Sequence, residues 1–479
     1  MNTTSLLNLG ASGMMAAQAQ LSTTGHNIAN ASVEGYSRQT VRAETAAGMY
    51  SGSGYFGRGV DVRTVERQVS SFLTDQVSQT SAQASADEVR KKMLGQLESS
   101  FGTGQQGIGY AATQLFNAFG DVAAQPADAS ARRVVLERSD DVASMFRSTA
   151  SSLNSLQSGV TQDLKNSVQE VNSLAKHIGD LNGQIAATRG GGQKPNDLLD
   201  ARDQLVKELS GYVQVNRVEQ DDGSLNLFVG GSQSLVVGTN AYQFKAEPDP
   251  TNTSVTRVTL EADGVSRQLD ANAVGGGRLG GLLEFQDSDL ASARSQLDAM
   301  ANSLSTEVNQ LQSQGWSLKL DASGQPVAGA ALFSTGKNGA ADLKLAAGLS
   351  TDDIAASAQG GTVTSPRSNN TNALAFQKLG EKTLTFTLAD QSKVDATFTD
   401  YFSQVVADVG VRVQTAGNRA DVSSKLASDA QQQLGSETGV NLDEEAANLI
   451  HYQQSYQAAA KVLQVAQKIF DTLISIGGG

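Results

Sequence analysis

Residues 441–476 read NLDEEAANLIHYQQSYQAAAKVLQVAQKIFDTLISI, and the periodicity of this stretch predicts one long helix. Asn441 can cap its start, and Glu444, three residues later, can complete a capping box. The acidic side chains of Asp443, Glu444 and Glu445 also favour the positive end of the helix dipole. At ~1.5 Å per residue, this predicted helix is roughly 54 Å long.

Two apolar seams run in parallel along the predicted helix. The first contains Leu442, Ala446, Leu449, Tyr456, Ala460, Leu463, Phe470 and Ile474, and the second contains Ala459, Val462, Ala466, Ile469, Leu473 and Ile476. A lone helix with two such seams would be poorly soluble, so it needs at least two neighbours. One of them can be a shorter N-terminal helix, and we expect the others to come from further copies of the chain.

The shorter helix is predicted over residues 6–28, where apolar positions recur with 3-4 spacing. Further helical composition covers residues 67–101 and 129–188, the stretch after 278, and residues 401–434. Heptad spacing persists from Val160 to Ile185, which indicates helices packed side by side. The apolar positions of the N-terminal seam are Leu7, Met14, Ala17, Leu21 and Ile28.

Residues 213–277 have a different pattern. Leu225, Leu227 and Val229 alternate with polar residues after an Asp222-Gly223 turn, which is typical of antiparallel hairpins. We therefore expect a small β domain that is self-contained and removable without loss of assembly. The overall prediction is a mainly α fold, with a long helical coiled-coil or bundle core built from both chain termini and a small inserted β domain. The expected domains are residues 1–40 with 440–479, residues 41–212 with 278–439 (including mixed α/β excursions at 316–400), and residues 213–277.

Composition excludes several classes of function. The 479 residues include 36 basic and 49 acidic side chains, and a net charge of −13 argues against nucleic-acid binding. Cysteine is absent, which rules out disulfides, thiolate-held metals and a cysteine nucleophile. No apolar run reaches the ~18–20 residues of a membrane span. Residues 1–33 contain no Lys, Arg, Asp or Glu, so a basic signal-peptide region is missing, and export would use a route without a cleaved signal.

Catalytic and cofactor chemistry has weak support in the sequence. Two G-x-G-x-x-G patterns, at 52–57 and 102–107, lack the preceding strand and following helix that nucleotide binding requires. The histidines, His26, His177 and His451, have no His or Glu at metal-site spacing. The sequence therefore predicts no catalytic residue, no cofactor and no metal, and a protein that is not an enzyme.

The two ends of the chain carry recognisable motifs. GHNIAN at 25–30, followed by GYSRQ at 35–39, resembles the N-terminal motif of bacterial flagellar rod, hook and hook-associated proteins. GVNLDEEAANL at 439–449, followed by YQQSYQAA at 452–459, resembles the C-terminal motif of the flagellar hook-associated protein 1 family. The joint presence of both motifs is specific, whereas the middle of the chain matches only in layout.

This resemblance implies a structural role at the junction between hook and filament. The terminal helices would stack with those of neighbouring subunits into the inner tube of a ring-like helical homo-oligomer. The implied partners are other copies of the chain, the hook protein, the next hook-associated junction protein, a dedicated export chaperone and the flagellar type III export apparatus, with no nucleic acid and no membrane insertion. The implied location is the flagellum, outside the cell, reached without a cleaved signal peptide.

The resemblance also singles out residues. The family motif carries over onto His26, Asn27, Asn30, Gly35, Tyr36, Arg38 and Gln39. The N-terminal seam is the expected assembly interface of the first helix. On the last helix, the expected assembly and chaperone interface contains Leu442, Leu449, Tyr456, Leu463, Ala466, Ile469, Phe470, Leu473 and Ile476.

Two alternative readings remain open at this stage. A sister axial protein, such as a hook or rod protein, would share part of the motif pattern. A secreted surface adhesin or antigen would depend on the segment 213–277. A wall hydrolase would need a charged or nucleophilic constellation, and the sequence offers none.

Overall fold

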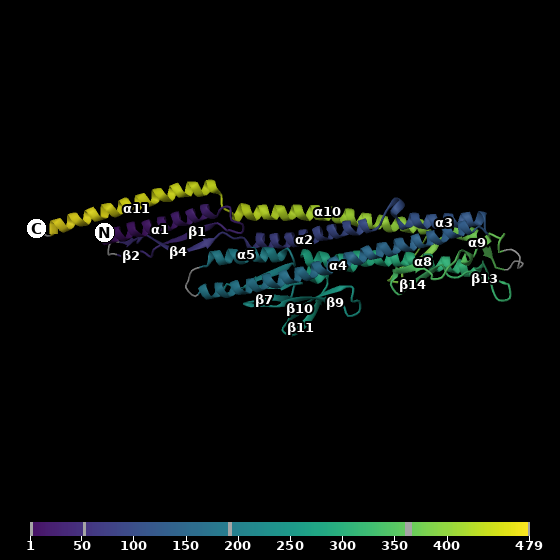
Figure 1. Cartoon of the computed structure of the whole chain (residues 1–479). Coiled ribbons are helices and arrows are strands. Elements are labelled where there is room, and N and C mark those ends of the chain that lie inside the picture. Colours follow the sequence, from purple (N-terminus) through teal and green to yellow (C-terminus); the bar gives the residue numbers. More distant parts are fainter. Residues whose placement is uncertain (1–2, 51–53, 190–193, 360–365, 478–479) are drawn as a thin grey trace.

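The computed structural model describes residues 3–50, 54–189, 194–359 and 366–477. These residues form a long, narrow molecule in which helices run lengthwise, and both chain ends lie at the same extremity (Figure 1). Within them, no helix combines the length and the apolar character that crossing a membrane requires.

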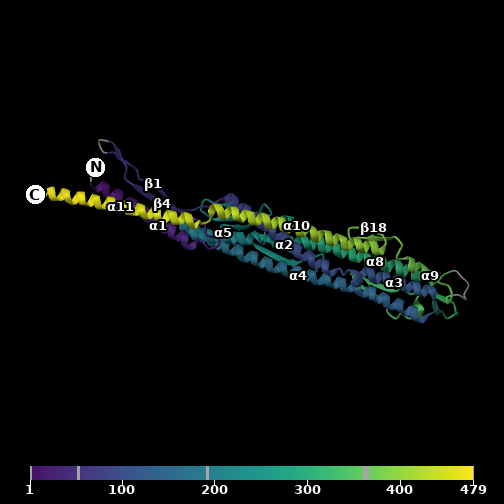
Figure 2. The ribbon, with the colours of Figure 1, turned by 90° about the horizontal axis from the view of Figure 1, so that it is seen from above.

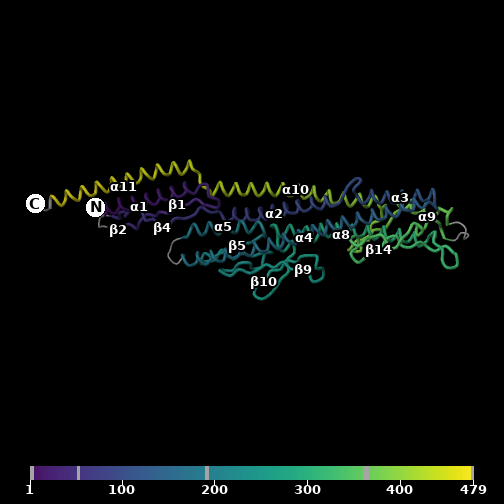
Figure 3. Tube along the Cα trace, viewed as in Figure 1, coloured from purple at the N-terminus to yellow at the C-terminus, as the bar shows by residue number. Residues whose placement is uncertain are grey.

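Two helices from opposite ends of the chain lie side by side at that extremity. They are α1 (Thr3–Asn30) and α11 (Leu442–Gly477), which we call the terminal pair. Figure 3 shows how the chain leaves α1 through an extended β hairpin and returns to α11 directly from the last helix of the body.

The body is a bundle of helices that run along its long axis (Figure 2). Its long members are α2 (Ser71–Ser100), α3 (Ile108–Ala124), α4 (Ala129–Arg189), α8 (Ala291–Gln314) and α10 (Phe398–Thr438). Shorter helices are α5 (Asn196–Ser210), α6 (Ala271–Val274), α7 (Gly277–Glu284) and α9 (Thr371–Lys378), with short turns at Gly104–Gln106 and Thr351–Asp353. A π-helical segment, Phe285–Leu290, joins α7 to α8.

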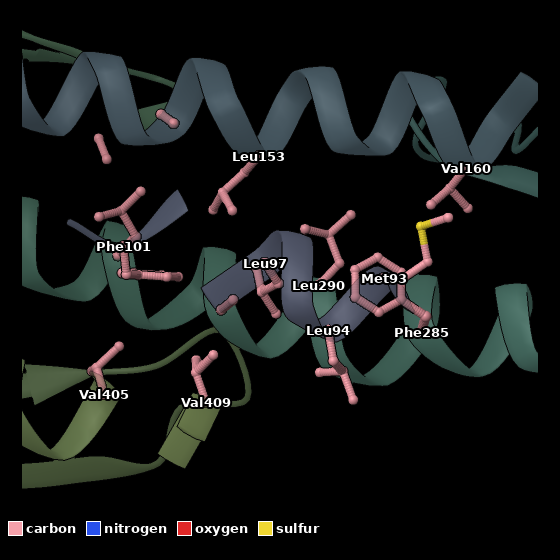
Figure 4. Close-up of a cluster of buried hydrophobic side chains, with 14 of the residues drawn as sticks. Met93, Leu94, Leu97, Phe101, Leu153, Val160, Phe285, Leu290, Val405 and Val409 are labelled. Carbon is pink, nitrogen blue, oxygen red and sulfur yellow. The ribbon is translucent and has the colours of Figure 1, made fainter. Parts of the chain in front are cut away.

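The core of the body lies where α2, α4, α8 and α10 meet. Figure 4 shows Met93, Leu94 and Leu97 of α2 packed among side chains from the other helices and from the π-helical segment. The heptad seam predicted in α4 is largely buried, since Val160 and Ile178 have no exposed surface and Ile185 is 1% exposed. The prediction of a mainly α fold with a long helical core and inserted β structure is confirmed.

The β structure consists of small antiparallel sheets. Near the terminal pair, β1 (Gln39–Thr45) pairs with β4 (Val60–Arg67), and β2 (Met49–Tyr50) pairs with β3 (Tyr55–Phe56). Residues 213–277 contain a four-stranded sheet of β5 (Val215–Glu219), β6 (Leu225–Val229), β7 (Gln233–Val237) and β8 (Asn240–Ala241), and a three-stranded sheet of β9 (Gln243–Pro248), β10 (Thr256–Ala262) and β11 (Val265–Leu269). The mixed region contains β12 (Gly315–Leu320), β13 (Pro326–Ala328), β14 (Phe333–Gly336), β15 (Gly339–Leu345), β16 (Ser357–Ala358), β17 (Leu384–Thr387) and β18 (Lys393–Ala396).

The segment 213–277 does not have a core of its own, which argues against the expectation of a self-contained insert. Its buried side chains belong to the same hydrophobic cluster as those of α4. Asn182 of α4 donates to the carbonyl oxygens of Leu225 (2.9 Å) and Gly238 (2.7 Å). Asn172 of α4 exchanges two hydrogen bonds with the backbone of Phe244. The sheets are therefore built onto the helix, and the division of the chain into three domains stays a prediction.

Candidate assembly site

The terminal pair is held by close approach of small residues. Gly10 faces α11 so closely that a Cβ at this position would lie 3.2 Å from the backbone nitrogen of Leu463. A Cβ on Gly13 would lie 3.5 Å from that of Ala459. On the facing side of α11, Ala466 is almost fully buried. Glycine and alanine thus set the contact between the two helices, and larger side chains pack around it.

The predicted N-terminal seam lies only partly in this contact. Ala17 is buried, Leu7, Met14 and Leu21 are half-buried, and Ile28 is exposed. α1 therefore still offers apolar surface to solvent in the single chain.

The predicted C-terminal seam is mostly uncovered, because α1 packs along one side of α11 only. Ala466 is buried and Tyr456 and Leu463 are half-buried. Phe470 is 43% exposed and Leu473 is 54% exposed. The side chain of Ile476 lies outside the described part of the chain. Exposed apolar side chains on α11 are Leu442, Leu449, Ile450, Val462, Val465, Ile469, Phe470, Leu473 and Ile474.

The family motifs meet where the terminal pair joins the body, around the buried side chain of Asn27. Its Nδ2 donates to the carbonyl oxygen of Gln39 (2.9 Å) and to Oε2 of Glu445 (3.1 Å). Its Oδ1 accepts from the hydroxyl of Tyr36 (2.7 Å) and the backbone N–H of Gln39 (3.0 Å). One amide therefore links α1, the following loop, β1 and the start of α11. We call Asn27, Tyr36, Arg38, Gln39 and Glu445 the clasp.

Within the clasp, the side chain of Arg38 forms ion pairs with two glutamates of the C-terminal motif. Its Nε donates to Oε1 of Glu445 at 2.7 Å, and its Nη1 lies 3.2 Å from Oε2 of Glu444. Its backbone N–H donates to the carbonyl oxygen of Thr438, the last residue of α10. Glu445 is 1% exposed, and a carboxylate is tolerated at such depth only when it is paired and hydrogen-bonded.

Helix α5 supports the clasp from the body side. Asn196 donates to the side chain of Gln39 (3.2 Å) and to the carbonyl oxygen of Val65 (3.1 Å). Asp200 accepts from the backbone N–H of Ser37 (3.2 Å) and from Arg67 (2.6 Å). These contacts fix the position of the terminal pair relative to the body.

The hydroxyl of Tyr36 is held in its neutral form. Burial raises its pKa well above the ordinary value, and the negative charges of Asp200, Asp197 and Glu445 raise it further. The ring of His26 meets that of Tyr36 edge-on at 5.6 Å. Tyr36 can therefore act as a hydrogen-bond donor to Asn27 throughout the neutral pH range.

The remaining motif residues shape the loop around the clasp. Gly35 has a φ of +81°, a left-handed conformation, and the side chain of Gln204 lies close above it. His26 and Asn30 lie on the rim, where Asn30 Nδ2 donates to the carbonyl oxygen of His26 at 2.9 Å. The structure thus brings Asn27, Tyr36, Arg38 and Gln39 together at one site.

Several participants were not singled out as site residues from the sequence. Asn441 caps α11 as predicted, since its side chain accepts from the backbone N–H of Asp443 at 3.0 Å. Glu444, however, was expected to complete a capping box, and both Glu444 and Glu445 were explained by helix-start electrostatics, whereas both side chains pair with Arg38. The one signal of this pairing in the sequence was Arg38, the lone cation of the GYSRQ motif. If such a cation is buried, it needs a carboxylate as its partner.

Other candidate chemistry finds no support in the described residues. No group of three or more His, Cys, Asp or Glu side chains among them could hold a metal ion. The glycine pattern at 102–107 forms a short 3-10 turn between α2 and α3, instead of a strand-to-helix loop. The pattern at 52–57 begins outside the described residues.

Comparisons with family models match most of the chain. The model described as "Flagellar hook-associated protein FlgK helical domain" matches residues 94–333. Models described as "Flagella basal body rod protein" and "Flagellar basal body rod FlgEFG protein C-terminal" match residues 7–36 and 431–476. The two end matches contain the Asn27 and Glu445 sides of the clasp.

Individual proteins are similar in sequence to this chain over nearly its full length. Flagellar hook-associated protein 1 of Escherichia coli strain K12 is 29% identical over 550 aligned residues, covering 98% of this chain and 100% of that protein. Its counterpart in Bacillus subtilis strain 168 is 26% identical, covering 97% of each. The solved structure of the flagellar hook junction protein FlgK from Burkholderia pseudomallei shares the fold, with a TM-score of 0.64 at 19% identity, over 75% of this chain and 99% of that one.

Proposed function

The chain belongs to the family of the flagellar hook-associated protein FlgK, and we propose that it is a structural subunit of the junction between hook and filament. The observation that supports this role best is the uncovered apolar surface of α11. α1 covers one side of α11, and Phe470, Leu473 and Ile474 stay exposed. Such an apolar surface is suited to burial against other subunits.

We propose that the terminal pairs of successive subunits pack against one another into a closed, tube-like assembly. The clasp supports this proposal because it fixes the angle between the terminal pair and the body in every copy. A repeated contact closes into a ring or helix only when each subunit presents its surfaces in the same geometry.

The partners of this assembly follow from the same family membership. We propose contacts with the hook protein on one side and with the next hook-associated junction protein on the other. Before assembly, the uncovered seam is an aggregation hazard, and a dedicated chaperone that covers residues 442–476 would remove it. Export would proceed through the flagellar type III apparatus, which would place the protein outside the cell without a cleaved signal peptide. The chain would act by assembly and not by catalysis.

The test is a strain that lacks the gene. Electron microscopy of the cell surface and an assay for flagellin in the medium together identify the assembly step that fails. Hooks without filaments, with flagellin lost to the medium, are the expected result. Absent hooks would place the protein in the rod or hook instead, and normal filaments would overturn the proposal and favour a surface adhesin.

A further inference from the structure

The hairpin that follows α1 ends in exposed aromatic side chains. In its outer ladder Met49 pairs with Phe56 and Tyr50 with Tyr55. Tyr55 is 81% exposed, Tyr50 is 64% exposed, and their ring centroids lie 5.4 Å apart. We call Met49, Tyr50, Tyr55 and Phe56 the aromatic tip.

Charge is absent from this tip and present behind it. Residues 46–57 contain no Asp, Glu, Lys or Arg, whereas the strands leading to the tip carry Arg42, Glu44, Asp61 and Arg63. Exposed strands are normally protected from association by charged side chains. The aromatic tip has no such charged side chains, so it is suited to packing against an apolar surface.

The base of the hairpin is fixed on α1. Gly59 has a φ of +99°, and a Cβ there would collide with the hydroxyl of Ser12. The backbone N–H of Val60 also donates to that hydroxyl at 3.4 Å. In Figure 1, α1 lies between α11 and the hairpin, and Figure 2 shows the hairpin pointing away from both helices. The tip is therefore separated from the α11 of its own chain.

The uncovered side of α11 offers the matching surface. Val462, Val465, Ile469 and Leu473 follow one another at 3-4-4 spacing and so form one stripe, with exposed fractions between 41% and 59%. We call these four residues the outer stripe. The stripe lies on α11 and the aromatic tip on the hairpin, and these two elements lie on opposite sides of α1 (Figure 1). Two different surfaces on opposite flanks allow a head-to-tail contact, which repeats from copy to copy and generates a ring or a helix.

We propose that the aromatic tip of one subunit packs on the outer stripe of a second copy of the chain. The inference rests on the proposed function and adds the lateral contact that joins one terminal pair to the next. The occupant is another copy because this chain itself supplies an apolar stripe that its own tip cannot reach.

The natural absence of cysteine makes a direct test possible. Tyr55→Cys is combined in turn with Val462→Cys, Val465→Cys, Ile469→Cys and Leu473→Cys, and assembled flagella are oxidised. At least one pair should give a ladder of disulfide-linked oligomers under non-reducing electrophoresis. A ladder, instead of a dimer alone, is the signature of a head-to-tail contact.

Two control pairs make a negative result decisive. Gly13→Cys with Ala459→Cys should form a disulfide within one chain, because their Cβ separation of 3.5 Å is within the disulfide range. Tyr55→Cys with Val411→Cys, an exposed site on α10, should give no ladder. The inference is overturned if the intrachain disulfide forms while all four stripe pairs stay monomeric, or if the α10 pair gives an equal ladder.

A second variant separates this inference from the proposed function. Tyr50→Ser with Tyr55→Ser should reduce filament-bearing cells roughly tenfold or more, because each intersubunit contact loses two aromatic side chains. Tyr110→Ser, at an exposed tyrosine of α3, is the matched control and should leave filaments intact. Normal filaments in the tip variant would overturn the lateral contact alone. Normal filaments in the gene deletion would overturn the proposed function as well.

Discussion

The side chain of Asn27 on α1 donates a hydrogen bond of 3.1 Å to the carboxylate of Glu445 on α11, across 418 positions of sequence. Both side chains are buried, and the charge of Glu445 is compensated by Arg38 at 2.7 Å. The two end motifs therefore form one structural unit. Each motif supplies polar groups that would be left buried and unpaired without the other.

Replacing Asn27 with Ala should loosen the clasp more than any change on its rim. The substitution leaves the hydroxyl of Tyr36 and the backbone N–H of Gln39 without their acceptor, and Glu445 without one donor. We expect the free energy of local opening to fall by ~2–4 kcal/mol. Native-state hydrogen exchange of the amides in β1 and the first turns of α11 would measure this change. The matched control is Asn30→Ala, and equal effects of the two substitutions would contradict the central role of Asn27.

The neutral hydroxyl of Tyr36 predicts a loss of stability at alkaline pH. Burial and the nearby carboxylates raise its pKa in the folded chain above the ordinary value of 10.0. Above pH 10 the unfolded chain therefore binds fewer protons than the folded chain, and stability falls as pH rises. Tyr36→Phe should cost about 1 kcal/mol at pH 7, through the lost hydrogen bond to Asn27. Because the variant lacks this proton, its deficit relative to wild type should shrink above pH 10.

Urea denaturation of both proteins at several pH values would check this expectation. The quantity to compare is the difference in transition midpoint between wild type and Tyr36→Phe, in which the titration of other groups cancels. A difference that stays constant from neutral to strongly alkaline pH would show that the pKa of Tyr36 is not raised by folding.

The helices could be predicted because their signal is local and repetitive. The seam of α4 recurs every three or four residues from Val160 to Ile185, and the capping side chain of Asn441 stands next to the helix that it starts. Burial of such a seam depends only on the presence of some apolar neighbour. The sequence therefore predicted the elements, their apolar faces and the pairing of the two terminal helices, but it did not identify which helices of the body pack together.

The clasp could not be predicted in the same way. The hydrogen bonds of Asn27 and Arg38 to Glu445 join residues more than 400 positions apart, and their pairing depends on the path of the whole chain. The contact between α1 and α11 also departs from the apolar periodicity. The backbones approach closely at Gly10 and Gly13, whereas Leu7 and Met14 are only half-buried. The spacing of apolar residues indicates which face of a helix is buried. The separation between two packed helices depends instead on the smallest side chains in their contact.

Deleting residues 213–277 should destabilise the body, contrary to what a self-contained insert would do. The deletion removes the partners of Asn172 and Asn182 and exposes apolar side chains of α4, each worth ~1.5–3 kcal/mol of burial. We expect a lower Tm and reduced solubility. The control is deletion of residues 249–254, an exposed turn between β9 and β10, which should change Tm little. A full deletion that melts like wild type would show that α4 does not need the sheets.

Substitutions on α11 should separate folding from assembly. Phe470 and Leu473 are 43% and 54% exposed in the single chain, so Phe470→Asp and Leu473→Asp should leave its Tm nearly unchanged. In a subunit contact, by contrast, the new carboxylate would be buried without a partner and would oppose association. We expect exported protein, hooks without filaments and flagellin in the medium, measured by electron microscopy and immunoblotting. Gln464→Asp places the same charge outside both seams and should preserve filaments. Normal swimming of the Phe470 and Leu473 variants would contradict burial of these seams between subunits, and a large fall in Tm would show that α1 or the body already covers them.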